Sequence, residues 1–226
     1  MSLGFFLWLL IAVSIIGFFG WTVYIQQRQK DAWRSFAKKF DMNFTEGKFF
    51  ETPSIEGFVK DRYVKLYESK ELDRLGKPVA KITLEVELNE KPPCAIAITS
   101  KSQQYIFSTV KFETTLRLND KNWDSSHLIG VSDETLARAY LTPLRLHRLN
   151  GFLMMKKAAT FFISSQDRTF LMVQTTQPLD NAKLVHNLVK KLFALALILE
   201  TNEGPKPATK KEPEKASGSD NNKSKK

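Results

Sequence analysis

The chain has 226 residues, 42% of them hydrophobic, and a net charge of +10. This length suits one domain with terminal segments, and the single cysteine, Cys94, cannot form an internal disulfide, which fits a reducing compartment. Six of the ten surplus positive charges lie on residues 26–48 and 201–226. This distribution favours an anionic membrane surface over nucleic acid, which we do not expect as a partner because binding it would call for one continuous basic stripe.

The segment Phe5–Ile25 has no charged residue and is almost entirely apolar. As a helix it would be about 31 Å long, close to the thickness of the hydrocarbon core of a bilayer. A cleaved signal peptide would have a basic start, a shorter apolar stretch and small residues at a cleavage site, whereas bulky aromatic residues follow Gly17 here. We therefore predict that residues 1–25 form an uncleaved transmembrane anchor, with Trp8 and Trp21 near its two ends.

The charges that flank this anchor predict its orientation. Residues 1–4 carry no basic side chain, whereas the other flank has five basic residues against one acidic residue, Asp31: Arg28, Lys30, Arg34, Lys38 and Lys39. Because basic flanks tend to stay in the cytoplasm, we expect a single-pass membrane protein with the bulk of the chain on the cytoplasmic side.

The rest of the chain divides into three predicted parts. Residues 26–41 are expected to form a juxtamembrane helix, because apolar residues from Trp33 to Phe40 recur at three- and four-residue spacing. Residues 42–200 are expected to form one cytoplasmic domain. Residues 201–226 contain no aromatic or large aliphatic side chain, which predicts a disordered basic tail.

Alternating apolar and polar residues predict the strands of the domain. The predicted strands are Ile55–Val59, Tyr63–Glu68, Ala80–Leu88, Cys94–Thr99 and Tyr105–Leu118, which favour an antiparallel meander, and then Thr160–Ser164 and Thr169–Thr175. In Ala80–Leu88 the alternation predicts one buried face and one solvated face, with Glu85 and Glu87 on the solvated face.

Capping residues predict three helices in the second half of the domain. Ser132 is expected to cap a short helix that ends near Leu141, and Thr142 to cap one that begins at Pro143 and either ends at Asn150-Gly151 or continues beyond it. Asp180 is expected to cap the last helix. The predicted fold class is therefore α+β: an N-terminal transmembrane helix followed by one domain with a mainly antiparallel sheet packed by helices.

The chain contains four features in a fixed order: FAKKFDMNFTEGKFFETPSIEGFVKDRYVKLYE, VSDETLARAYLTP, a strand pair and LVKKLFALALILE. Over most of residues 36–200 this order resembles uncharacterised bacterial single-pass membrane-anchored proteins. The shared features are hydrophobic spacings with a few glycines and prolines. The resemblance implies a protein of the bacterial inner membrane and brings no catalytic residues with it.

No catalytic, cofactor or metal site is predicted. The three histidines, His127, His147 and His186, have no second histidine or cysteine at metal-ligand spacing. Asp124 to His127 contain the residue types of a hydrolase triad, but neighbours in one loop do not provide the convergent geometry that a triad needs. The chain also has no phosphate-binding glycine loop.

One stretch has an unusual charge pattern, because no acidic residue lies between Glu134 and Asp167. It contains four basic residues that are candidates for binding anionic lipid headgroups or an acidic partner: Arg145, Arg148, Lys156 and Lys157. A plain solvated helix face is the alternative interpretation. Two functional hypotheses follow: a membrane-tethered, non-enzymatic binding or scaffold module, or a membrane-tethered hydrolase-like enzyme whose site is too dispersed to recognise in the sequence.

Overall fold

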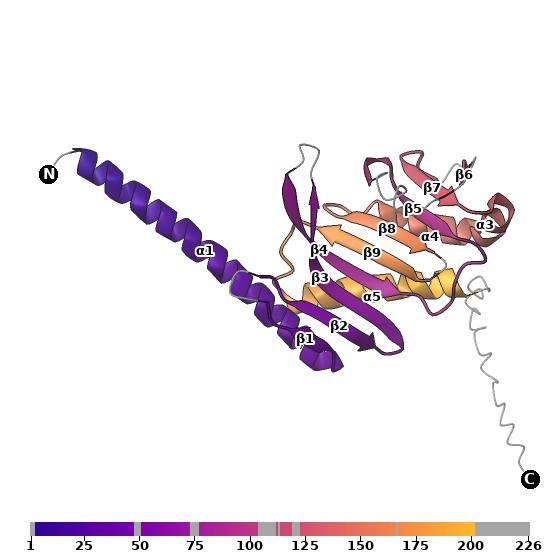
Figure 1. Cartoon of the computed structure of the whole chain (residues 1–226), viewed down its shortest axis with the longest axis horizontal. Helices are drawn as coiled ribbons and strands as arrows, with labels where there is room; N and C mark the ends of the chain where they lie inside the picture. The colour runs from indigo at the N-terminus through magenta and orange to yellow at the C-terminus, as the bar shows by residue number, and fades with distance from the viewer. Residues whose placement is uncertain are drawn as a thin grey trace, which may run out of the picture.

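A single helix, α1 (Leu3–Phe40), connects the apolar N-terminal segment to the domain in the computed structural model (Figure 1). The model describes residues 3–47, 51–72, 77–103, 112, 114–118, 123–165 and 167–201. The N-terminal part of α1 projects away from the domain, and an 18-residue window within Gly4–Phe40 is apolar enough to cross a membrane, with none of it buried. The predicted juxtamembrane helix is continuous with the apolar helix and ends at Phe40.

The remaining elements form an α+β domain, which confirms the predicted fold class. In chain order they are β1 (Asn43–Thr45), β2 (Ser54–Val59), β3 (Arg62–Leu72), β4 (Pro78–Glu87), β5 (Ile96–Ser100), the 3-10 turn η1 (Lys101–Gln103), β6 (Thr114–Thr115), β7 (His127–Val131), α3 (Glu134–Tyr140), α4 (Pro143–Leu153), β8 (Ala159–Ser164), β9 (Thr169–Thr175) and α5 (Ala182–Glu200). The short strands β1 and β7 were not predicted. Most of the predicted strand Tyr105–Leu118 and the tail after Thr201 lie outside the described residues.

The described strands form one antiparallel sheet in the order β1-β2-β3-β4-β9-β8-β5-β7-β6. The predicted five-strand meander is therefore wrong after β4, because the hairpin β8–β9 lies between β4 and β5. The pairs Leu84↔Val173 and Ile98↔Phe162 fix the register of this hairpin against its two neighbours. The apolar run in β9 is buried on both faces of the sheet, because Leu171 and Val173 join the main core and Met172 packs with Phe161 and Ile163 on the other face.

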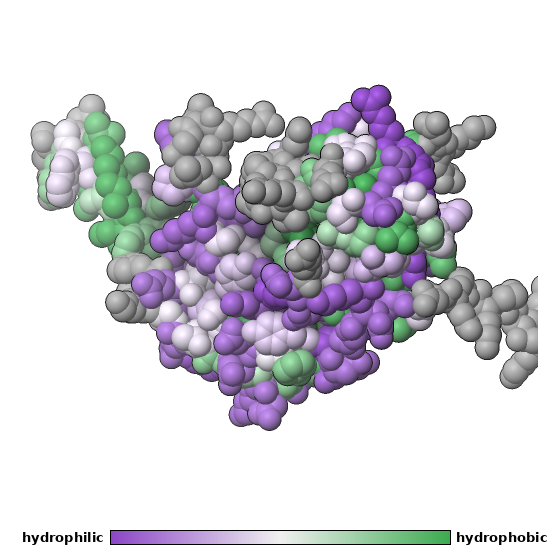
Figure 2. Space-filling model, turned by 45° about the vertical axis from the view of Figure 1, so that its right-hand side comes forward, coloured by the Kyte–Doolittle hydropathy of each residue, from purple (hydrophilic) through white to green (hydrophobic). Residues whose placement is uncertain are grey.

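The main core lies between the sheet and the helices α1, α4 and α5. Its largest fully buried side chains include Trp33 and Phe36 of α1, Leu149 of α4, and Leu84 and Phe162 of the sheet. The apolar outer surface of the chain is concentrated on α1, whereas the visible face of the domain is mostly hydrophilic (Figure 2). The part of α1 that joins the core begins at Ala32, so the core forms without the N-terminal half of this helix.

Glu85 is buried, although the strand pattern predicts a solvated side chain. Only 8% of it is exposed. Its carboxylate accepts a hydrogen bond from the Tyr67 hydroxyl at 2.6 Å and lies 3.5 Å from the Arg168 guanidinium. The second face of a central strand is covered by side chains of its neighbours, which strand alternation alone does not report.

The helix caps agree with the predictions in one case of three. Thr142 caps α4 as expected, and this helix continues through Gly151 to Leu153. Asp133 rather than Ser132 caps α3, because the Ser132 hydroxyl accepts a hydrogen bond from Ala95 N–H of the neighbouring strand segment.

Asn181 rather than Asp180 caps α5, and its side chain accepts a hydrogen bond from Lys183 N–H at 2.8 Å. The Asp180 carboxylate lies 3.5 Å from the Arg28 guanidinium of α1. A tertiary contact between α1 and the start of α5 therefore engages the predicted capping residue.

Candidate functional site

The four predicted basic residues do not lie on one surface. Arg148, Lys156 and Lys157 are exposed, whereas only 6% of Arg145 is exposed. Arg148 follows Arg145 by one turn of α4, but the last turn of α5 covers the earlier residue. The exposed basic surface therefore excludes Arg145, and whether the other three residues bind a lipid or a partner stays a prediction.

Arg145 binds the C-terminal end of α5. Its Nη1 donates to the Tyr140 carbonyl at 2.6 Å, and its Nη2 and Nε donate to the Thr201 and Ile198 carbonyls at 3.0 and 3.4 Å. The guanidinium also lies 4.1 Å from the centre of the Tyr140 ring. Because the last carbonyls of a helix have no partners within it and carry partial negative charge, this arginine stabilises the end of α5.

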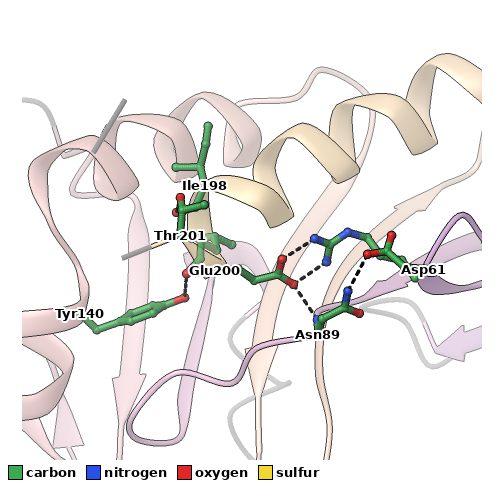
Figure 3. A network of polar contacts seen from close by, with 8 residues as sticks. Asp61, Asn89, Tyr140, Ile198, Glu200 and Thr201 are labelled. Atoms are coloured by element: carbon green, nitrogen blue, oxygen red, sulfur yellow. Dashed lines mark hydrogen bonds and ion pairs between the residues drawn. The ribbon is translucent and has the colours of Figure 1, made fainter. Parts of the chain in front are cut away.

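A second buried arginine also contacts the end of α5 (Figure 3). The Glu200 carboxylate accepts two hydrogen bonds from the Arg62 guanidinium, and it accepts one from Asn89 N–H at 2.6 Å. The Asn89 side chain donates to Asp61 at 3.1 Å. The bond to Glu200 raises the pKa of Arg62, although burial opposes this shift. This network holds α5 on the sheet, and the Glu200 carboxylate serves a structural role.

An open groove runs along α5, between this helix and the end of α4 with the segment that follows α4, and contains the exposed basic residues. It consists of two adjoining hollows of about 670 Å³ and 490 Å³, both within the usual size of ligand pockets, about 300–1,000 Å³. Met155, Lys156, Lys191 and Ala194 border both hollows, so they form one continuous groove, here called the α4–α5 groove.

Five cationic side chains line the α4–α5 groove: Arg148, Lys156, Lys157, Lys190 and Lys191. None of the described residues that line it is acidic. Lys190 and Lys191 come from α5 and are not among the predicted residues, because sequence spacing does not show that α5 lies beside the segment after α4. Because these two lysines line the same hollow as Lys156 and Lys157, positive charge is concentrated in the groove.

The floor of the groove is apolar. It is formed mainly by Phe152 and Met155 on one side, by Leu188 and Leu195 on the other, and by Leu184 at one end. Leu184 is 51% exposed. The groove thus combines an apolar floor with a cationic rim, which suits an anionic amphiphile.

One end of the groove lies beside α1. The Trp33 Nε1 donates to the carbonyl of Leu179, a groove residue, at 3.0 Å, and Arg28 pairs with the adjacent Asp180. Arg28 and Trp33 follow Ile25, the last residue of the apolar segment, by three and eight positions, or about 5 and 12 Å along the helix axis. Each headgroup layer of a bilayer is about 5–7 Å thick. If α1 spans a membrane, this end of the groove lies in the headgroup layer or just outside it, on the aqueous side.

Other polar clusters offer less. The Asp124 carboxylate accepts a hydrogen bond from Ser126 N–H at 2.8 Å, a contact within its own turn. His127 is buried and its ring contacts that of Trp123. Burial lowers the pKa of His127. Among the described residues no group of three or more histidine, cysteine or acidic side chains could hold a metal ion.

Comparison with known proteins gives little guidance. No protein-family model matches the chain, and no curated protein matches it. Among solved structures, the chain has a match to the crystal structure of the mycobacterial trehalose monomycolate transport factor A, TtfA, with a TM-score of 0.42 and 10% sequence identity over 76% of this chain and 90% of that chain. A similarity at this level carries no argument about function.

Proposed function

We propose that this protein is a membrane-tethered, non-enzymatic binding module whose α4–α5 groove binds anionic lipid headgroups of the membrane that holds α1. The observation that carries the proposal is the cluster of five cations, without a carboxylate, in a groove that begins beside Trp33. Each basic side chain near an anionic leaflet contributes about 1 kcal/mol to binding. The five together are enough to hold the domain against such a surface.

The position of the groove favours lipid over an acidic protein partner. The end at Leu179 is close to the first turn of α1 beyond the apolar segment, so headgroups are the anions present there at the highest concentration. The enzymatic alternative has less support, because the described residues that line the groove include no carboxylate, histidine or cysteine to act as acid, base or nucleophile.

A fluorescence experiment on the full chain tests this proposal. An environment-sensitive dye is attached at Asn187→Cys, an exposed groove position, in a Cys94→Ser background. The protein is placed in nanodiscs of phosphatidylcholine, with or without an equal part of phosphatidylglycerol. We expect a blue shift only with phosphatidylglycerol, and its loss in about 1 M salt, where the screening length falls to about 3 Å.

Matched variants assign the response to the groove. Lys156→Gln, Lys190→Gln and Lys191→Gln together should weaken headgroup binding about 100-fold, at about 1 kcal/mol for each charge. The control replaces three exposed cations elsewhere on the domain with glutamine: Lys60, Lys101 and Arg117. A dye that responds equally to both lipid mixtures, or a control that loses the response as fully as the groove variant, would refute headgroup binding in the groove.

We further propose that the domain lies on the cytoplasmic side of the bacterial inner membrane, with Met1 outside and the apolar segment uncleaved. The basic residues that follow the segment support this orientation. A cysteine added to the tail should resist an impermeant thiol reagent in intact cells and react after lysis. Labelling in intact cells would contradict the orientation, and a mature chain that begins after Trp21 in mass spectrometry would contradict the anchor.

A further inference from the structure

We infer that the α4–α5 groove also takes up an acyl chain of the anionic lipid, so that the lipid is partly lifted out of the bilayer rather than bound only by its headgroup. This inference rests on the proposed function and adds the second half of the ligand. The observation behind it is the apolar floor, which a headgroup alone would leave exposed to water.

The dimensions of the floor fit an acyl chain. Along α5 it extends from Leu184 to Ile198, a distance of about 21 Å at 1.5 Å per residue. The acyl chains of one leaflet span about 15 Å, half of the hydrocarbon thickness. The hollows of about 670 and 490 Å³ provide the corresponding volume.

The charges define where the headgroup binds. Lys156 of the segment after α4 and Lys191 of α5 border both hollows, so a phosphate between them would lie near the middle of the floor and leave about 10 Å of it along α5 on either side, enough for about two thirds of a chain. Because no acidic residue is among the described lining residues, the groove favours an anionic headgroup over a zwitterionic one.

The route into the groove is short. Leu179 and Leu184 line the hollow nearest to α1. The Leu179 carbonyl accepts a hydrogen bond from Trp33, about 12 Å beyond the apolar segment along α1, and the adjacent Asp180 pairs with Arg28, about 5 Å beyond it. An acyl chain could therefore move from the bilayer edge onto apolar side chains. Leu184, half exposed at this end, is the first large apolar side chain such a chain would meet.

Photocrosslinking distinguishes this inference from headgroup binding. The full chain is placed in phosphatidylcholine nanodiscs that contain phosphatidylglycerol with a diazirine at the end of one acyl chain, and adducts are mapped by mass spectrometry after irradiation. We expect adducts within residues 152–158 and 184–198 as well as on α1. Adducts confined to α1 would overturn chain uptake, while the dye at Asn187→Cys would still report separately on headgroup binding.

Variants with exposed substitutions complete the test. Lys156→Gln with Lys191→Gln should reduce groove adducts roughly 30-fold, at about fivefold for each lysine, and Leu184→Gln should also reduce them. The control Lys60→Gln with Lys101→Gln should leave them unchanged. Equal groove adducts from the variants and the control, or from a phosphatidylcholine carrying the same diazirine, would also overturn the inference. Unchanged melting temperatures show that each variant is folded.

Discussion

Replacing Arg145 with glutamine should destabilise the domain strongly, although this residue lies in a sequence segment that reads as a basic surface. The hydrogen bond from its guanidinium to the buried Tyr140 carbonyl is short, 2.6 Å, and a bond of a charged group at such a site contributes about 2 kcal/mol. The two bonds to the end of α5 are partly exposed and contribute less, about 0.5–1 kcal/mol each. The contact with the Tyr140 ring adds about 1 kcal/mol.

These contributions together predict a loss of about 4 kcal/mol in the free energy of unfolding. For a domain of this size the melting temperature should fall by about 8–16 °C. Arg145→Lys should give an intermediate loss, because one ammonium group keeps the charge but cannot reach all three carbonyls in the planar geometry of a guanidinium.

Urea unfolding of the full chain in neutral detergent, followed by tryptophan fluorescence, measures this loss. The matched control is Arg148→Gln, one turn further along α4 and exposed, which should change the free energy of unfolding by no more than about 0.5 kcal/mol. An Arg145→Gln protein within about 1 kcal/mol of the wild type would refute the role given to Arg145 at the end of α5.

Three further predictions concern stability, measured in the same way. Gly151→Ala should stabilise α4 by about 0.5–1 kcal/mol, because a Cβ there meets no atom within 4 Å; destabilisation would contradict the helical geometry at this position. Trp33→Ala should cost about 3–5 kcal/mol, because this side chain is fully buried and bonded to Leu179, and a loss below about 1 kcal/mol would show that α1 does not pack on the domain. Burial lowers the pKa of His127 in the fold below that of the unfolded imidazole, about 6.5, so the unfolded chain binds the proton more readily; stability should therefore fall as the pH drops below about 6.5, and His127→Asn should reduce that slope. An unchanged slope in His127→Asn would assign the pH dependence to other groups.

The sequence by itself predicted those features that depend on local spacing. An uncharged run as long as Phe5–Ile25 can be recognised without tertiary information, because helix length and hydropathy are properties of the segment alone. Thr142 followed by Pro143 predicted the start of α4 for the same reason, since a cap and a helix-compatible proline act within one turn. Alternation likewise predicted β2, β3, β4, β8 and β9, and with them the α+β class.

Only the tertiary structure decided which distant segments meet. The position of β8–β9 between β4 and β5 depends on pairing between strands that are far apart in the chain. Asn181 caps α5, while the predicted cap Asp180 lies 3.5 Å from Arg28 of α1. Arg145 and Arg148 look alike in the sequence, yet the end of α5 buries the first and leaves the second in a groove. In that groove Lys190 and Lys191 of α5 line the same hollow as Lys156 and Lys157 of the segment after α4, and residues that share a site through packing need no shared pattern in the sequence.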